Sequence, residues 1–193
     1  MFLALQIAAL LLVGASDARA KFGPAARADA DLPQVEGDGY RGVIFPAPPF
    51  NPKALGADGP WEPSATDVRE FERLLRPALE SSLRDPSSIA VSRCRRGESD
   101  GWCQEFERRR KEEIKSILGD LSRYRRQYAG VTAGGRKTLV ANFFPGVLPK
   151  GDDWHPAWRH EWVNVHGGGT AYWEISFDVQ EKRFHDFRAN SPK

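Results

Sequence analysis

The sequence has no excess of charge of one sign and no long apolar run. Its 28 Lys and Arg stand against 26 Asp and Glu, which gives a formal net charge of +2 at pH 7. Nucleic-acid-binding domains usually carry a basic excess on one face, so we expect no nucleic-acid partner. The longest apolar run, residues 2–13, has about 12 residues, whereas a membrane-spanning helix needs roughly 20. We therefore predict no membrane span in the mature chain.

Residues 1–20 have the pattern of a cleavable secretory signal. Small and polar residues follow the apolar run, and Ala18-Arg19-Ala20 matches the A-x-A cleavage pattern. This pattern places the cut before Lys21. We therefore expect an exported protein, either periplasmic or secreted.

The sequence is also poor in cysteine, with Cys94 and Cys103 as its two. In an oxidising compartment, an even pair this close in sequence most often forms a disulfide. Gly97 and Gly101 lie between them and allow the chain to turn back. A metal site is the alternative, but eight intervening residues without a histidine do not match zinc-ligand spacing. We predict a Cys94–Cys103 disulfide, no metal and no cofactor.

Residues 21–63 differ in composition from the rest of the chain. Eight prolines and six glycines fall in this segment. Proline lacks the backbone donor that helices and sheets need, and glycine is costly to order. We predict a mostly irregular lead-in, in which residues 43–45 form a short edge piece. The chain then divides into a signal peptide (1–20), this lead-in (21–63) and one domain (64–193).

Two helices are predicted at the start of that domain. Ser64 or Thr66 can cap the first helix, and its apolar residues fall three or four positions apart, at Val68, Phe71, Leu75 and Leu79. Pro77 lies inside this pattern and is expected to kink or end the helix. The second helix is predicted from about Gln104. Its basic run at 108–111 is interleaved with glutamates, which indicates a solvated face with i,i+4 pairs.

The apolar period then changes from helical to two. This change predicts strands at 124–131 and 137–144, a hairpin of 162–166 with 172–179, and a last strand at 183–189. Both faces of the strand at 137–144 are largely apolar, so it should be central and covered on both sides. The order predicts an α+β domain with one or two helices packed on a meandering antiparallel sheet of about five strands.

Three short motifs carry a resemblance to known proteins. They are YRRQYAG at 124–130, NFF at 142–144, and the glycines at 167–169 with Tyr172-Trp173. This pattern resembles one found in small exported bacterial proteins with no known activity, and it covers about residues 64–190. Their layout is similar to the cystatin-like group, in which a helix lies across an antiparallel sheet. The resemblance implies that fold and no functional residue.

Three segments suggest a catalytic or ligand-binding motif, but each departs from the pattern that such a site requires. Residues 130–138 approach a phosphate-binding loop, but Arg136 separates the second glycine from Lys137, and a strand pattern follows where a helix is required. The glycines at 167–169 could cradle an anion, but the flanking strand patterns favour a turn. His160-Glu161 begins a metalloprotease signature that would need a histidine where Asn164 stands.

The loop at 152–162 is the segment richest in aromatic and polar groups, and it supplies our candidate binding residues. These residues are Trp154, His155, Trp158, His160 and Trp162. The three tryptophans recur every four positions, so they could stack against a sugar ring. The alternative, which we favour, is that they cap the end of the core. The histidines and acids of the loop could also bind a metal, although we predict none.

Other polar groups lie on the predicted strands. Glu174 and Asp178 share one strand face, but they lie roughly 13 Å apart from about 3.3 Å per residue, which exceeds the spacing of glycosidase carboxylates. We therefore interpret this face as solvated. His166 and His185 could meet Asp186 or Glu174, although the spacing does not require it.

The sequence therefore favours a non-enzymatic exported binding or inhibitor-type protein. A protein partner would use an edge strand or the loop at 145–161. The first alternative is a cell-wall or polysaccharide binder that uses the loop tryptophans. The second alternative is a hydrolase with a site built from His155, His160, His166 and His185. The sequence does not set the catalytic residues or the oligomeric state.

Overall fold

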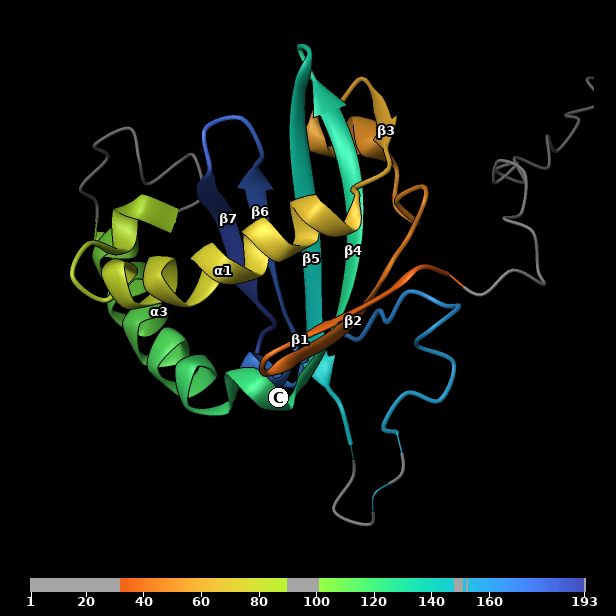
Figure 1. Cartoon of the computed structure of the whole chain (residues 1–193). Helices are drawn as coiled ribbons and strands as arrows, with labels where there is room; N and C mark the ends of the chain where they lie inside the picture. Colours follow the sequence, from red (N-terminus) through yellow and green to blue (C-terminus); the bar gives the residue numbers. More distant parts are fainter. Residues whose placement is uncertain (1–31, 90–100, 148–150, 152, 193) are drawn as a thin grey trace, which may run out of the picture. The chain divides into compact units, whose positions relative to one another are not determined.

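The structure is a computed structural model, and it describes residues 32–89, 101–147, 151 and 153–192 (Figure 1). The signal-peptide prediction lies outside the described residues. So does the Cys94–Cys103 disulfide, because Cys94 and the side chain of Cys103 are not described. Among the described residues, no helix is long and apolar enough to cross a membrane.

Seven strands form one open sheet. The order across the sheet is β1-β2-β4-β5-β6-β7, and β3 pairs with β4 beside this path. Only the β2–β4 pair is parallel, and the other pairs are antiparallel. The strands are β1 (Gln34–Gly37), β2 (Tyr40–Ile44), β3 (Gly59–Trp61), β4 (Tyr124–Ala133), β5 (Arg136–Pro145), β6 (Trp173–Asp178) and β7 (Arg183–Ala189).

An α+β class with a mostly antiparallel sheet is thus confirmed, although the sheet has more strands than the five expected. The excess comes from the predicted lead-in, where the prediction of irregular structure is wrong for residues 34–37, 40–44 and 59–61. Its prolines and glycines punctuate three short strands, β1, β2 and β3, instead of preventing them. The prediction of an edge piece at 43–45 is also wrong, because β2 lies between β1 and β4.

Glycine at position 42 allows β2 to pack closely against the sheet. A Cβ there would lie 2.6 Å from the Tyr128 ring and 2.8 Å from the Arg126 carbonyl oxygen. A residue with a side chain would have to displace the backbone of β4. Val43 and Ile44 follow and are buried on opposite faces of the sheet.

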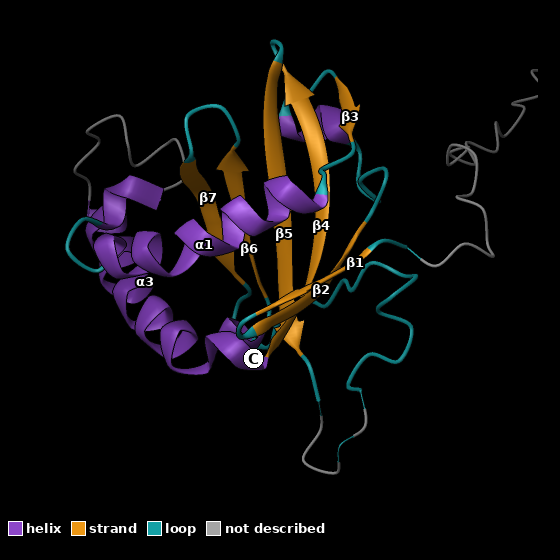
Figure 2. Cartoon of the chain, viewed as in Figure 1, coloured by secondary structure: helices purple, strands orange, loops and turns teal. Residues whose placement is uncertain are grey.

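Both long helices lie on the same face of the sheet, and α1 runs across the strands (Figures 1 and 2). Helix α1 (Ala65–Ser82) begins with a capping box made by Ser64 and Asp67. The predicted end at Pro77 does not occur. Pro77 is exposed, whereas Leu75 and Leu79 on either side of it are buried against the sheet, so packing holds the helix together.

Helix α3 (Gly101–Asp120) packs Ile114 and Ile117 into the same core. On its exposed side, Arg108 pairs with Glu105 and Glu112, and Arg109 pairs with Glu113. The interpretation of the basic run as a solvated face is confirmed for Arg108 and Arg109. It is wrong for Arg110, which is 2% exposed and donates to the Phe187 carbonyl. Short 3₁₀ helices occur at Pro52–Leu55, Pro86–Ile89, Leu121–Arg123 and Gly169–Ala171.

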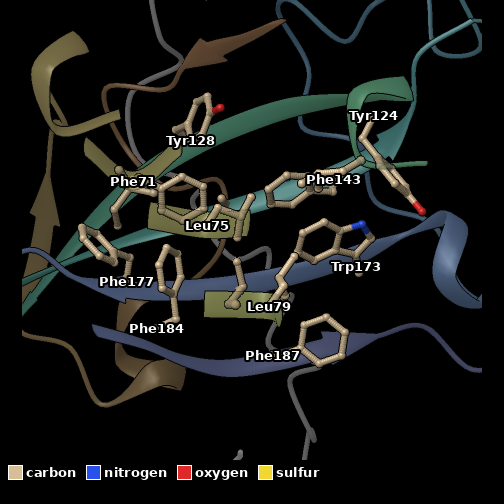
Figure 3. Close-up of a cluster of buried hydrophobic side chains, with 14 of the residues drawn as sticks. Phe71, Leu75, Leu79, Tyr124, Tyr128, Phe143, Trp173, Phe177, Phe184 and Phe187 are labelled. Atoms are coloured by element: carbon tan, nitrogen blue, oxygen red, sulfur yellow. The ribbon is translucent and has the colours of Figure 1, made fainter. Parts of the chain in front are cut away.

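Aromatic rings fill the space between the helices and the sheet (Figure 3). Phe71 of α1 makes edge contacts with Tyr128, Phe177 and Phe184, and Phe143 stacks on Trp173 with ring centroids 3.6 Å apart. All five of these sheet rings are nearly or fully buried. This face of the sheet therefore forms the main hydrophobic core, and the opposite face is left for other contacts.

The predicted strand at 162–166 is absent, and β6 pairs with β5 on that side of the sheet instead. Two buried amides of the sheet explain this result. Gln127 donates to the carbonyls of Trp158 and Glu161 and accepts from the Val163 amide, while Asn142 donates to the Val163 carbonyl. The loop backbone is thus bonded to side chains rather than to a neighbouring strand. We call Gln127 and Asn142 the amide clamp.

Candidate functional site

The three loop tryptophans do not share a face. Trp158 is 1% exposed and packs against Phe144 and other residues behind the sheet, whereas Trp154 is 48% exposed. Trp162 is half-buried and meets the rings of Phe45 and Phe50 at their edges. The structure therefore offers no three-ring platform. Trp158 and Trp162 instead pack on the second face of the sheet, and Trp154 caps no core.

The candidate histidines are also spread apart. His155 contacts the Phe144 ring, its Nε2 atom lies 3.2 Å from the Tyr172 hydroxyl, and burial lowers the pKa of its imidazole. His160 and His166 are exposed. Within the described ranges, no group of three or more His, Cys, Asp or Glu side chains is arranged to hold a metal ion. The loop histidines therefore do not gather into one site there.

A different set of polar side chains meets on the face of β6 and β7 that lies away from the helices. Glu174 pairs with Arg188, and Ser176 pairs with His185, but one extra residue of β7 lies between these two pairs. This β-bulge lets Phe184 and Phe187 both enter the core. It also brings His185 and Asp186 together beside Ser176, with a φ of 52° at Asp186.

The bulge fixes an imidazole–carboxylate pair. His185 Nδ1 and Asp186 Oδ2 lie 2.7 Å apart, and both side chains are partly exposed. If Asp186 accepts from Nδ1, the second ring nitrogen of His185 is left to contact a ligand. The sequence allows a contact between His185 and Asp186 but does not require it.

Glu174 is the most buried carboxyl of this set. Burial raises the pKa of Glu174 above its ordinary value, and the nearby Arg188 guanidinium opposes that shift. Its strand neighbour on the other side is Asn142, whose amide group is already used in the clamp. The Glu174 carboxyl makes no hydrogen bond to another described residue, so both of its oxygens are available to a ligand.

These groups line two adjoining hollows of about 370 and 270 Å³, which share Val140, Glu174 and Arg188. We call the two hollows together the sheet groove. Its larger part is bounded by Ala57, Val131, Ala133 and Thr138, and it contains Ser176, His185 and Asp186. Its smaller part is bounded by residues 49–51, Trp162 and Asn164. Of the five predicted binding residues, only Trp162 lines the groove.

The other buried charge cluster serves the fold. Glu72 of α1 accepts from Arg126 at 3.0 Å and from the Tyr128 hydroxyl at 2.7 Å. Arg126 also donates to the carbonyls of Tyr124 and Leu121. Burial raises the pKa of Glu72, although both partners oppose this shift. Since its donors are used internally, this cluster joins helix to sheet rather than contacting a ligand.

Sequence reasoning missed the groove because it paired the wrong carboxyls. Asp178, the last residue of β6, binds Arg136 at the start of β5 and lies outside the groove. The partner that matters for Glu174 is Arg188, which lies across the β6–β7 pair. The signal was present in the predicted strands 172–179 and 183–189, because an antiparallel hairpin places opposite residues side by side.

Comparisons with protein families, with curated proteins and with solved structures found no match to this chain.

Proposed function

We propose that this chain is an exported, non-enzymatic binding protein and that the sheet groove is its ligand site. The proposal keeps the periplasmic or secreted location that the signal pattern predicts, and it keeps a cystatin-like arrangement of helix and sheet. It moves the binding site from the loop at 152–162 to the face of the sheet that this loop partly covers.

The observation that supports the proposal is a set of polar side chains that make no hydrogen bond to other described residues. Glu174, Ser176, Asn164 and Arg188 line the groove, and none of them makes a side-chain hydrogen bond to another described residue. Convergent polar groups beside apolar side chains are typical of ligand sites, and hollows of roughly 300–1,000 Å³ hold small molecules. The amide clamp is the contrast, because its polar groups are used within the fold.

The test is a fragment screen followed by protein NMR on the full chain. Fragments that bind in the groove should shift the amide signals of Glu174, Ser176 and Arg188. Arg188→Ala should then weaken binding about tenfold or more, since a hydrogen bond to a charged group contributes about 1.5–3 kcal/mol. Arg183→Ala is the matched control, because Arg183 is an exposed arginine on the same strand outside the groove. If no fragment shifts the groove signals, the proposal fails.

A second candidate function is contact with a protein partner through Val147 and Trp154, which we call the loop tip. They are 51% and 48% exposed, and they are the exposed large hydrophobic residues of the described ranges. A bridge between Val147 and Asp153 and a bond from the Trp154 amide to the Gly146 carbonyl hold the backbone next to Val147 against the backbone next to Trp154. Exposed apolar groups held side by side are a common feature of protein contact sites.

A further inference from the structure

We propose that the ligand of the sheet groove is a neutral saccharide. This inference rests on the proposed binding function and names the chemical class that the groove selects. Four kinds of observation lead to it: the charges of the groove, its unused hydrogen-bonding groups, its apolar surfaces and its division into two hollows.

The groove has charged groups of both signs. Its titratable groups are the carboxyls of Glu174 and Asp186, the guanidinium of Arg188 and the imidazole of His185. Asp186 lies against His185, and Glu174 lies across from Arg188. An anionic ligand would be repelled by the two carboxyls, and a cationic ligand would be repelled by the guanidinium beside Glu174. A ligand without net charge avoids both repulsions.

The hydrogen-bonding groups of the groove match hydroxyl groups. The Glu174 carboxyl offers two acceptors, Arg188 offers a planar fork of donors, and Asn164 and Ser176 each offer both. Planar side chains with two donors or two acceptors can bind a pair of adjacent hydroxyls at once. A saccharide presents such pairs around each ring, with donor and acceptor in every hydroxyl, so it can satisfy both kinds of partner.

The groove also has apolar surfaces, which include one indole. Val131, Val140 and Ala57 line the larger hollow, while Phe50 and Trp162 line the smaller one. A sugar ring has polar edges and faces of C–H groups, and an indole offers a large apolar face for such a surface. Phe45 and Phe50 hold Trp162 by edge contacts, so the indole is already positioned before a ligand arrives.

The two hollows adjoin at Glu174, Val140 and Arg188. This arrangement fits two neighbouring rings of one chain, with the linkage between them beside Glu174 and Arg188. A free monosaccharide would occupy one hollow alone. We therefore expect an oligosaccharide to bind more tightly than its monomer.

The test is an affinity series by isothermal titration on the full chain. The neutral probes are the tetramers of N-acetylglucosamine, of β-1,4-glucose and of α-1,4-glucose, together with their monomers. The charged probes are the tetramers of glucosamine and of galacturonic acid. We expect at least one neutral tetramer to bind, its monomer to bind more weakly, and both charged tetramers to bind at least tenfold more weakly.

Variants then locate the bound sugar. Glu174→Ala and Arg188→Ala should each lower the affinity about tenfold or more, while Arg183→Ala should leave it unchanged. Each variant is first compared with the parent chain by its NMR spectrum, so that loss of folding is recognised. Trp162→Phe keeps an aromatic ring against Phe45 and Phe50, and it should lower the affinity for the tetramer more than for the monomer.

The results that would overturn the saccharide inference fall into two groups, which differ in what they say about the proposed binding function. If the charged tetramers bind best, or if no sugar binds while groove fragments still shift the signals of Glu174 and Arg188, the saccharide class is wrong and the proposed binding function stands. If neither sugars nor fragments reach the groove, the saccharide inference and the proposed function both fail.

Discussion

Replacing Gln127 by alanine should release the loop that covers the second face of the sheet. The Gln127 amide takes part in four hydrogen bonds. It donates to the carbonyls of Trp158 and Glu161 at 2.7 and 2.6 Å, and it accepts from the Val163 amide and from Asn142 at 2.8 and 3.1 Å. Its side chain is fully buried, so alanine leaves these partners without a replacement inside the protein.

The expected loss in the free energy of unfolding follows from the number of hydrogen bonds that Gln127 makes. At about 1 kcal/mol for each buried hydrogen bond, Gln127→Ala should lower the free energy of unfolding by about 4 kcal/mol. For a urea dependence of about 2 kcal/mol per molar, the unfolding midpoint should fall by about 2 M. The assay is urea unfolding followed by tryptophan fluorescence, with hydrogen exchange of the Val163 amide as a local measure of the loop.

Gln180→Ala is the matched control for that experiment. Gln180 accepts one hydrogen bond, from the Lys137 amide, at an exposed position. Its loss should cost about 0.5 kcal/mol or less. If the two glutamine variants cost the same, or if the Val163 amide keeps its protection in Gln127→Ala, then the clamp does not hold the loop and our account of the second face is wrong.

Three further predictions concern pH, packing and the loop tip. The pKa of Glu174 is raised from 4.5 in the folded chain, so the stability that its proton contributes is present below pH 4.5 and is lost as pH rises through the folded pKa. Glu174→Gln should flatten that part of a curve of unfolding free energy against pH, and an unchanged curve would contradict the raised pKa. Gly42→Ala should lower the free energy of unfolding in urea by about 1–3 kcal/mol. Gly59→Ala is the control, because its added Cβ would meet nothing within 4 Å, and an equal loss of stability in both variants would refute the close approach of β2 to β4. Trp154→Ala should change the free energy of unfolding by less than about 0.5 kcal/mol but abolish any protein contact made by the loop tip. A partner captured equally by the parent chain and by the variant would exclude protein contact through the loop tip.

Local patterns in the sequence predicted the elements that local forces determine. The cap of α1 is Ser64, one of the two residues expected, and the apolar period of α1 and the positions of β4, β5, β6 and β7 along the chain agree with the sequence pattern. The central strand β5 is buried on both faces, with Phe143 on one and Phe144 on the other. Each of these features depends on neighbours within a few positions of the chain.

The errors arise where distant contacts override local preference. Proline and glycine spacing in residues 32–61 favoured irregular structure, yet β2 gains a place between β1 and β4 because Gly42 fits beneath Tyr128. The apolar stretch at 162–166 was predicted as a strand. It is irregular because Gln127 and Asn142, at least 20 positions away, bind its backbone.

The candidate site shows the same division. The sequence could place Glu174 and Arg188 on consecutive strands, but the extra residue that brings His185 beside Asp186 is a bulge in the register of β6 with β7. The mark that this shift leaves in the sequence is the spacing of three between Phe184 and Phe187, where a regular strand alternates every two residues. The aromatic loop was conspicuous in the sequence, but the residues that it covers, rather than its own side chains, supply most of the groove.

The most direct test of the central claim is to map by NMR where a bound ligand touches the protein. The chain is titrated with the N-acetylglucosamine tetramer and with the fragments from the screen, and backbone amide and indole shifts are followed residue by residue. We predict the largest shifts at Glu174, Ser176 and Arg188 and at the Trp162 indole, with no change in α1. Shifts confined to the exposed loop residues Trp154 and His160, or spread over the helices, would contradict the assignment of the sheet groove as the ligand site.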